Sequence, residues 1–359
     1  MARLSLIYHA VPLRNAYHLS FGILNHFDVF YVLLEEGEAF GVGEITPLPG
    51  YGRETPAGVG ESVARACEWI RRGRDLRDSV SRLWNDAPFA ASGIACAAET
   101  LHVKMGQLIH TPAPCHVRVV GLCGGGTTEE VGAAAKHLAE QGYGTFKMKV
   151  GGLTPMEDAA RVKAAARFLP PDGRLRLDAN QAYSLEQAYV FCEAVDGLEA
   201  IECLEQPFDR DAWAPHEDVA SRVSVPLMLD ESIWAPEDVR RAADCGASAV
   251  KFKLCKHPGL AGTREMVTEA RRQGLHVVYG NGVQSVLGNH LEALAYCDAS
   301  LQSAFEGNGF LKPDRSPVSH DLAVRKGTLI DGGLHGVREA VKEGKILFST
   351  ELSLEDVES

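Results

Sequence analysis

Short apolar segments alternate with longer amphipathic segments from about residue 116 to residue 312, and this alternation limits the folds open to the chain. Apolar runs of this length are typical of buried strands, and amphipathic segments with apolar spacings of three and four are typical of surface helices. Repeated strand–helix units form a parallel sheet with helices outside it. Eight such strands can close into a barrel, for which about 200 residues are enough. Seven helix candidates separate the eight strand candidates, which are CHVRVVG, TFKMKVG, RLRLDAN, AIECLEQP, PLMLDES, AVKFKLCK, HVVYGNG and SLQSAFEG.

A doubly wound open sheet is the alternative arrangement of the same units. Such a sheet usually carries a glycine-rich phosphate-binding turn after its first strand. The corresponding segment, GLCGGGTTEE, is rich in glycine but lacks the G-x-G-x-x-G spacing, and no ribose-binding acid follows a second strand near it. The predicted core is therefore an α/β barrel of the (β/α)7β type, spanning residues 116–312.

The remaining chain is too long to be barrel loops, since the protein has 359 residues. Residues 1–115 contain strand-like segments, a hairpin that turns at EEGE, and two helical stretches, so we predict an α+β domain there. The barrel lacks an eighth helix, which leaves residues 313–359 free to pack elsewhere. The sequence therefore predicts two domains and a C-terminal segment.

The overall charge excludes two classes of partner. Lys and Arg number 36 and Asp and Glu number 48, so the formal net charge is −12. A chain this acidic has no general attraction for nucleic acid or for an anionic membrane. No apolar run approaches the ~20 residues that span a bilayer. The nine cysteines are scattered and mostly lie in apolar contexts typical of buried free thiols, and MARLSLIYHAVPL lacks the features of a signal peptide, so we expect a cytoplasmic location.

Three carboxylates end adjacent strand candidates, where a barrel places its active site. Asp178, Glu205 and Asp230 end the third, fourth and fifth strands at similar heights. Three converging carboxylates repel one another unless a cation or lysines balance them. Oxygen ligands without His or Cys favour a hard cation, and Mg²⁺ fits best. The alternative is a ring of ion pairs between these acids and nearby lysines.

Two Lys-x-Lys pairs flank these acids. Lys147 and Lys149 share one face of the second strand, and Lys251 and Lys253 share one face of the sixth. Strands two and six stand opposite each other in a ring of eight, so a central substrate would meet a lysine on each side. Lysines near a metal and other cations can act as general bases near neutral pH. The alternative is that each pair is simply solvated.

The remaining strand ends exclude two hydrolase classes. The seventh strand ends in Asn281 and the eighth reaches Glu306, and no strand end carries a His-x-His pair. A zinc barrel needs imidazole ligands, so that class is excluded. No G-x-S-x-G context is present, which excludes the serine hydrolases that depend on it.

The motifs FKMKVG, RLDANQAY, LEQPF, MLDESI and FKLCKHPG, in this order and spacing, resemble the enolase superfamily, specifically the muconate-lactonising subgroup of the mandelate racemase/muconate lactonising enzyme family. The segment FGILNHFDVFYVLLEEGEAFGVGEITPLPGYGRET is similar to the capping domain of that family, so the resemblance covers nearly the whole chain. It implies that residues 1–115 form a cap over the barrel mouth and that residues 313–359 return to this cap. Family members often form dimers or octamers, so a homo-oligomer is expected.

The resemblance also implies roles for individual residues. Asp178, Glu205 and Asp230 would bind Mg²⁺, for which Mn²⁺ can substitute. Lys149 would be an acid/base on one face of the substrate and Lys253 its counterpart on the other. Lys147 would lie near the substrate carboxylate and lower the pKa of Lys149.

A second set of residues would surround the metal ligands or contact the substrate: Asn180, Glu231, Asn281, Glu306 and Lys251. Lys251 has an alternative place deeper in the barrel, paired with an acid, and Glu306 could either pair with a substrate ammonium or support neighbouring groups. Further candidates, for which ordinary loop packing is equally expected, are Gln284 on the seventh strand loop and His18, Phe21 and Tyr51 in the cap.

The shared chemistry implied by the family is removal of a proton next to a carboxylate, with Mg²⁺ stabilising the enolate. Two opposed lysines favour a racemase or epimerase of a carboxylate-bearing small molecule, namely an amino-acid derivative. The alternatives are a cycloisomerase or lyase (dehydratase) of the same superfamily, and a barrel that only binds. FEGNGFLKPD lacks the Asp-x-Asp of dipeptide epimerases, and strand seven lacks the His of the mandelate racemase subgroup, so the substrate stays open.

Overall fold

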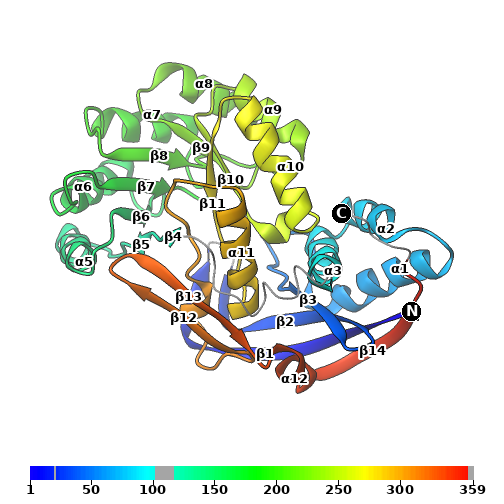
Figure 1. Cartoon of the computed structure of the whole chain (residues 1–359). Helices are drawn as coiled ribbons and strands as arrows, with labels where there is room; N and C mark the ends of the chain where they lie inside the picture. The colour runs from blue at the N-terminus through cyan, green and yellow to red at the C-terminus, as the bar shows by residue number, and fades with distance from the viewer. Residues whose placement is uncertain (20–21, 102–116, 355–359) are drawn as a thin grey trace.

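The computed structural model describes residues 1–19, 22–101 and 117–354. Figure 1 shows an α/β barrel beside a domain built on an antiparallel sheet, with the C-terminal segment running back to that sheet. The predicted fold class, a (β/α)7β barrel with an α+β cap completed by the C-terminal tail, is confirmed. The predicted boundary between residues 115 and 116 lies outside the described residues, so the exact domain limits stay predictions.

The barrel sheet is parallel, and its seven strands follow one another in chain order. These strands are β5 (Gly121–Leu122), β6 (Thr145–Lys149), β7 (Arg174–Asp178), β8 (Ile201–Glu205), β9 (Leu227–Leu229), β10 (Ala249–Phe252) and β11 (His276–Tyr279). The helices on its outside are α5 (Thr128–Glu140), α6 (Pro155–Ala166), α7 (Leu185–Ala194), α8 (Trp213–Arg222), α9 (Pro236–Asp244), α10 (Gly259–Arg272) and α11 (Val286–Asp298).

The eighth strand is less regular than predicted. Phe305 forms a single parallel bridge with Val119, and Glu306 N donates to Tyr279 O at 3.1 Å. This segment therefore closes the ring between β11 and the start of the first unit. It does not extend into a regular strand because Gly307 and the short 3-10 helix η3 (Gly309–Leu311) follow at once, and glycine supports strand structure poorly.

Within the described residues, the capping domain consists of an antiparallel sheet and three helices. Its strands, in the spatial order β14-β1-β2-β3, are β1 (Ala2–Leu19), β2 (Gly22–Glu36), β3 (Ala39–Ile45) and β14 (Lys345–Leu352). The helices are α1 (Val59–Arg71), α2 (Leu76–Trp84) and α3 (Pro88–Leu101), preceded by the 3-10 turn η1 (Pro56–Gly58). Helix α3 lies against β3 so closely that a Cβ at Gly43 would come 1.9 Å from Gly93 O. Only glycine at position 43 permits this contact.

The C-terminal segment divides between the two domains. Strands β12 (Ser319–Arg325) and β13 (Thr328–His335) form a hairpin that pairs with β4 (Val117–Arg118) beside the barrel. After α12 (Val337–Lys342), strand β14 pairs with β1 and becomes an edge of the cap sheet. The return to the cap agrees with the prediction, whereas the hairpin beside the barrel was not predicted.

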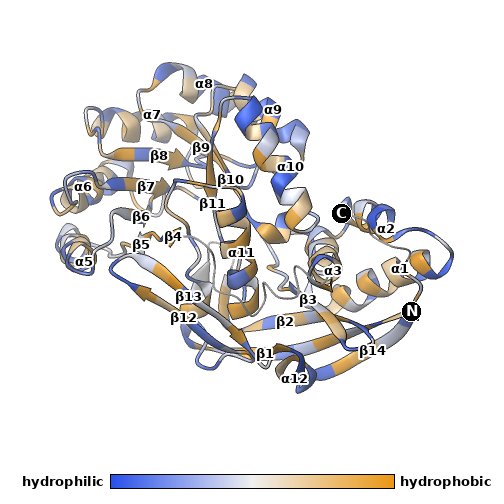
Figure 2. Cartoon of the chain, viewed as in Figure 1, coloured by the Kyte–Doolittle hydropathy of each residue, from blue (hydrophilic) through white to orange (hydrophobic). Residues whose placement is uncertain are grey.

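Hydrophobic residues concentrate in the strands of both domains, while α9 and α10 carry hydrophilic stretches (Figure 2). Phe146, Leu177 and Phe252 are fully buried within the barrel unit. Seven cysteines of the described residues are buried free thiols, as predicted. Cys297 differs because it is disulfide-bonded. The thiol pattern therefore gives weaker support for a cytoplasmic location than expected, and that location stays a prediction.

The cap is fixed to the barrel through the N-terminus of α11. Glu44, at the end of β3, accepts hydrogen bonds from Ser285 N at 2.6 Å and from Gly288 N at 2.9 Å. A carboxylate at a helix N-terminus satisfies amide groups that have no partner within the helix. Ser92 Oγ also donates to Leu254 O at 2.7 Å, from α3 to the barrel. These contacts hold the cap loops at the carboxyl ends of the barrel strands.

Candidate active site

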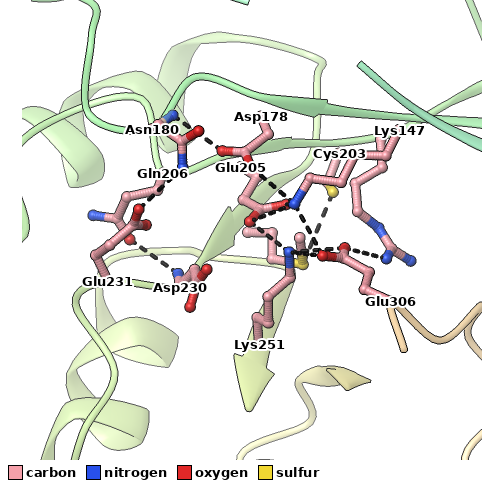
Figure 3. A network of polar contacts seen from close by, with 12 residues as sticks. Lys147, Asp178, Asn180, Cys203, Glu205, Gln206, Asp230, Glu231, Lys251 and Glu306 are labelled. Atoms are coloured by element: carbon pink, nitrogen blue, oxygen red, sulfur yellow. Dashed lines mark hydrogen bonds and ion pairs between the residues drawn. The ribbon is translucent and has the colours of Figure 1, made fainter. Parts of the chain in front are cut away.

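Two of the predicted metal ligands end neighbouring strands. Asp178 of β7 and Glu205 of β8 are register partners, and both side chains are buried. Lys147 Nζ lies between them, 2.8 Å from Asp178 Oδ2 and 3.0 Å from Glu205 Oε2. Figure 3 shows this group of acids with Lys147 reaching in from β6.

The third predicted ligand, Asp230, follows β9 and has partners of its own. Lys253 Nζ lies 2.7 Å from Asp230 Oδ2, and Lys256 Nζ lies 3.2 Å from Asp230 Oδ1. Tyr51 Oη, from the cap, donates to Asp230 Oδ1 at 2.9 Å. Burial acts to raise the pKa of Asp230, but the neighbouring lysines hold it well below its usual range.

No three acidic, His or Cys side chains in the described ranges already stand in the geometry of a metal site. The ion pairs explain this, because Lys147 separates Asp178 from Glu205 and two other lysines hold Asp230. This arrangement is the ion-pair alternative considered from the sequence. The metal site therefore stays a prediction.

The donor set nevertheless fits a hard cation. Burial and repulsion from Asp178 raise the pKa of Glu205, so the carboxylates need additional positive charge to stay ionised together. Asn180 Oδ1 and Glu231 Oε2 are buried beside these acids without a hydrogen-bond partner among the described residues. Asn180 Nδ2 donates to Glu231 Oε1 at 3.2 Å, which keeps the two residues together. Closely placed oxygen donors of this kind suit Mg²⁺.

The two predicted acid/base lysines line one cavity of about 420 Å³ at the carboxyl ends of the strands. Lys149 ends β6 and is exposed. Lys253 follows β10, is buried, and donates to Tyr51 Oη at 2.9 Å. The cavity is lined by Tyr17, Leu48, Tyr51, Leu122, Cys123, Gly124, Gly125, Lys147, Lys149, Arg161, Asp178, Asn180, Asp230, Glu231, Lys253, Asn281, Gly282, Val283, Glu306, Asn308 and Lys312.

Lys251 and Glu306 form a charged layer beneath the acids. Lys251 is fully buried, bonds Glu205, and lies 2.8 Å from Glu306 Oε1. Lys147 Nζ and Arg176 Nη1 also reach Glu306, at 3.0 Å and 2.6 Å. Burial acts to raise the pKa of Glu306, but these cations hold it well below its usual range. Lys251 thus occupies the deeper, acid-paired place, and the contacts of Glu306 favour a supporting role over ammonium binding.

The other predicted residues are divided between the cavity and its surroundings. Asn281 lines the cavity and donates to Glu292 Oε2 at 2.7 Å. Gln284 is buried and is not among the lining residues. Of the cap candidates, Tyr51 reaches the site. The side chain of His18, and Phe21 as a whole, lie outside the described residues.

Gln206 and Lys256 were missed from the sequence. Gln206 Oε1 accepts hydrogen bonds from Asp230 N at 2.9 Å and from Ser232 N at 3.2 Å, so it positions the loop that carries Asp230. Its φ is +39°, an unusual value for a residue other than glycine, and such strain often marks functional positions. Gln206 follows Glu205 in LEQPF and Lys256 lies in FKLCKHPG, so membership of these motifs was the available signal.

A larger cavity of about 1160 Å³ opens at the amino ends of the barrel strands. Arg118, Arg174 and Glu202 are among its lining residues. Barrel enzymes carry their chemistry at the carboxyl ends of the strands, so this second cavity is not the candidate active site.

Fold and site together define a barrel enzyme that places three strand-end acids between opposed lysines under a cap. Residues 130–337 match the family model for the enolase C-terminal domain-like fold, and residues 1–101 match that for the MenC N-terminal domain. The chain belongs to the mandelate racemase/muconate lactonising enzyme family of the enolase superfamily, as its motifs predicted. It is therefore an enzyme.

Similar proteins include both isomerases and a synthase. An aromatic dipeptide epimerase from Herpetosiphon aurantiacus is 29% identical over 86% of this chain and 90% of its own length. An o-succinylbenzoate synthase from Citrobacter koseri is 32% identical over 73% of this chain and 76% of its own. A mandelate racemase/muconate lactonising protein from Roseovarius nubinhibens, solved in complex with magnesium, has a TM-score of 0.79 at 21% identity, covering 97% of this chain and 99% of its own. Within the described residues, every helix is too short or too polar to cross a membrane.

Proposed function

We propose that this enzyme removes the proton α to a substrate carboxylate in a Mg²⁺-dependent reaction and acts as a racemase or epimerase of an amino-acid derivative. The observation that carries the proposal is the placement of Lys149 and Lys253 on β6 and just after β10, four strands apart, around one cavity lined by Asp178 and Asp230. A proton can thus leave one face of the substrate and return to the other.

Each turnover moves one proton to one lysine and one proton from the other. Lys149 Nζ, in its neutral form, takes the proton from the α-carbon, and Lys253 Nζ gives a proton to the opposite face. Asp178, Glu205 and Asp230 would hold the Mg²⁺ ion, whose charge stabilises the enolate. The reverse reaction exchanges the roles of the two lysines.

The relatives support the class of reaction. One is an epimerase and another an o-succinylbenzoate synthase, and both kinds of product can follow from an enolate. The magnesium complex of a protein with this fold supports the choice of metal. The fully buried acids next to unpartnered oxygens of Asn180 and Glu231 support the same choice.

A second candidate function is a lyase or cycloisomerase that uses one lysine as base. The two lysines differ in their surroundings, which favours this alternative. Lys253 is paired with Asp230 and Tyr51, whereas Lys149 forms no ion pair with a carboxylate of the described residues. Lys253 would then act only through its charge.

Exchange of the α-hydrogen in D₂O separates these functions. The Mg²⁺-loaded enzyme is incubated with both enantiomers of N-acyl amino acids and with dipeptides, and deuterium is followed by NMR. For a racemase, Lys149→Met exchanges only one enantiomer, Lys253→Met only the other, and neither racemises. For a lyase, a single lysine is needed for turnover. Lys163→Ala, an exposed change on α6, is the matched control. Absence of exchange across the whole panel would refute proton abstraction.

The expected homo-oligomer is also a proposal. Light scattering on the purified protein measures its mass, and a monomer at micromolar concentration would contradict it.

A further inference from the structure

The cap and the barrel are joined by backbone pairing at the cavity mouth. Leu13 of β1 forms an antiparallel bridge with Pro313, which follows η3. Arg14 N donates to Lys312 O at 3.0 Å, and Asp314 N donates to Pro12 O at 2.8 Å. This pairing fixes the segment that carries Lys312 beside the cap strand.

Lys312 and Tyr17 come together next to this joint. Lys312 Nζ lies 4.4 Å from the centroid of the Tyr17 ring, and both side chains are half-buried in the wall of the active-site cavity. An ammonium over an aromatic face is held by the ring's negative charge density. Lys312 is therefore held in place at the cavity wall.

No carboxylate among the described residues pairs with Lys312. Lys147 and Lys253, at the floor of the cavity, each have acidic partners, whereas Lys149 is exposed and forms no ion pair with a described carboxylate. A half-buried charge without a counter-ion is unfavourable, and proteins usually pair such groups. The site thus holds a cation whose charge is not balanced by the described protein groups.

The pKa of Tyr17 agrees with an excess of positive charge on this side of the cavity. Burial acts to raise the pKa of Tyr17, but Lys312, Lys149 and Lys147 together bring it below the usual value of 10.0. Positive potential therefore dominates on this side of the cavity. An anion bound here would receive both the ammonium of Lys312 and the hydroxyl hydrogen of Tyr17.

The cavity also has apolar lining residues, namely Leu48, Leu122 and Val283. The acids at the floor would bind, through the metal, the carboxylate next to the reacting carbon. A ligand that extends from the metal end to Lys312 therefore needs a second polar end.

We propose that the substrate carries a second carboxylate, distinct from the one at the metal end, and that Lys312 binds it with Tyr17 as hydrogen-bond donor. Lys312 is then a specificity-determining residue. This inference rests on the proposed function, because it assigns the second end of the same substrate.

Matched substrate pairs test the proposal. The first pair is N-succinyl-phenylalanine and its neutral N-succinamoyl analogue, and the second is N-acetyl-glutamate and N-acetyl-glutamine. With Mg²⁺ present, α-hydrogen exchange in D₂O gives kcat and KM, and calorimetry gives the Kd of each compound. We expect the acid of at least one pair to be preferred about tenfold or more, mainly through KM and Kd, because a charge-assisted contact is worth roughly 1.5–3 kcal/mol.

Variants at Lys312 test whether this residue causes the preference for the acid over the neutral compound. Lys312→Ala should bring the acid-to-neutral ratio to about one, Lys312→Glu should reverse it, and Lys312→Arg should keep it. Tyr17→Phe should lower the ratio by a smaller factor, since only the hydroxyl is lost. Lys163→Ala controls for a general loss of positive charge.

The outcomes are distinguishable from failure of the proposed function. Equal treatment of acid and neutral compounds by the natural enzyme in both pairs overturns the inference, as does a Lys312→Ala variant that retains the preference. If the acid binds more tightly and Lys312→Ala removes this difference in Kd, yet no compound exchanges deuterium, the inference stands and proton abstraction fails.

Discussion

Lys253 Nζ donates a hydrogen bond of 2.9 Å to Tyr51 Oη and lies 4.2 Å from the centroid of the same ring. Tyr51 belongs to the cap loop, and its hydroxyl donates in turn to Asp230 at 2.9 Å. One cap residue therefore orients a proposed acid/base and a proposed metal ligand at once. This links the position of the cap to the chemistry at the barrel mouth.

Tyr51→Phe keeps the ring over Lys253 but removes the hydroxyl. We expect kcat for α-hydrogen exchange to fall about tenfold with little change in KM, since a hydrogen bond to a charged group contributes roughly 1.5–3 kcal/mol. Tyr51→Leu removes the ring as well, so its kcat for α-hydrogen exchange should fall further. Deuterium exchange measured by NMR gives both constants. Full activity of Tyr51→Leu would show that the contact plays no part in turnover.

Lys251→Met tests the buried charge layer. The change removes one of the two lysines that contact both Glu205 and Glu306, so the free energy of unfolding should drop by up to about 3–5 kcal/mol. Urea denaturation followed by circular dichroism measures this loss. Adding Glu306→Gln removes one of the two acids that lose the Lys251 ammonium and should restore part of the lost free energy of unfolding. If Lys251→Met alone were as stable as the natural protein, Lys251 would not be a stabilising counter-ion of these acids.

The sequence was sufficient for the fold and for the positions of charged residues at the strand ends, whereas the roles of these residues stay predictions. The alternation of strands and helices predicted the barrel, because strand ends at intervals of 23 to 29 residues must rise to similar heights around one ring. Asp178 and Glu205 are indeed register partners. Lys147 of β6 and Lys251 of β10 enter the same interior network because each contacts both Glu205 and Glu306.

Long-range pairing could not be predicted in the same way. The contact of Tyr17 with Lys312 depends on how β1 meets the segment after η3, and those two segments lie almost 300 residues apart in the chain. Gln206 was missed because its amide acts on a neighbouring loop rather than through a charge. The length of the eighth strand was overestimated, because an apolar segment in the sequence does not show how many of its backbone groups pair with neighbouring strands.

His216 makes stability depend on pH. Burial lowers the pKa of His216 to about 4, and the ring packs between Ala212 O, at 2.8 Å from Nδ1, and Gln206. The folded state therefore favours the neutral ring, and protons bind better to the unfolded chain. The stabilisation is complete above about pH 6.5 and is lost as the pH falls toward 4.

The prediction for His216 is a steeper loss of thermal stability between pH 6.5 and pH 4.5 in the natural protein than in His216→Asn. Asn does not titrate in this range, although it fills less space and should lower the melting temperature at every pH. Differential scanning calorimetry in buffers of equal ionic strength measures the two slopes. Parallel slopes would exclude His216 as the responsible group.

Addition of Mg²⁺ should raise the melting temperature of metal-free protein. Asp178, Glu205 and Lys147 now form ion pairs, and a cation that takes the place of the ammonium binds only to the folded state. At a concentration of about 100 times Kd, such a ligand adds roughly 2.7 kcal/mol to the free energy of unfolding. For a chain of this size the melting temperature should rise by several degrees, saturating with concentration. Asp178→Asn should lose most of this rise, whereas Lys163→Ala should keep it. An unchanged melting temperature from micromolar to 10 millimolar Mg²⁺ would refute the metal site, and Lys147 would then be the permanent counter-ion of these acids.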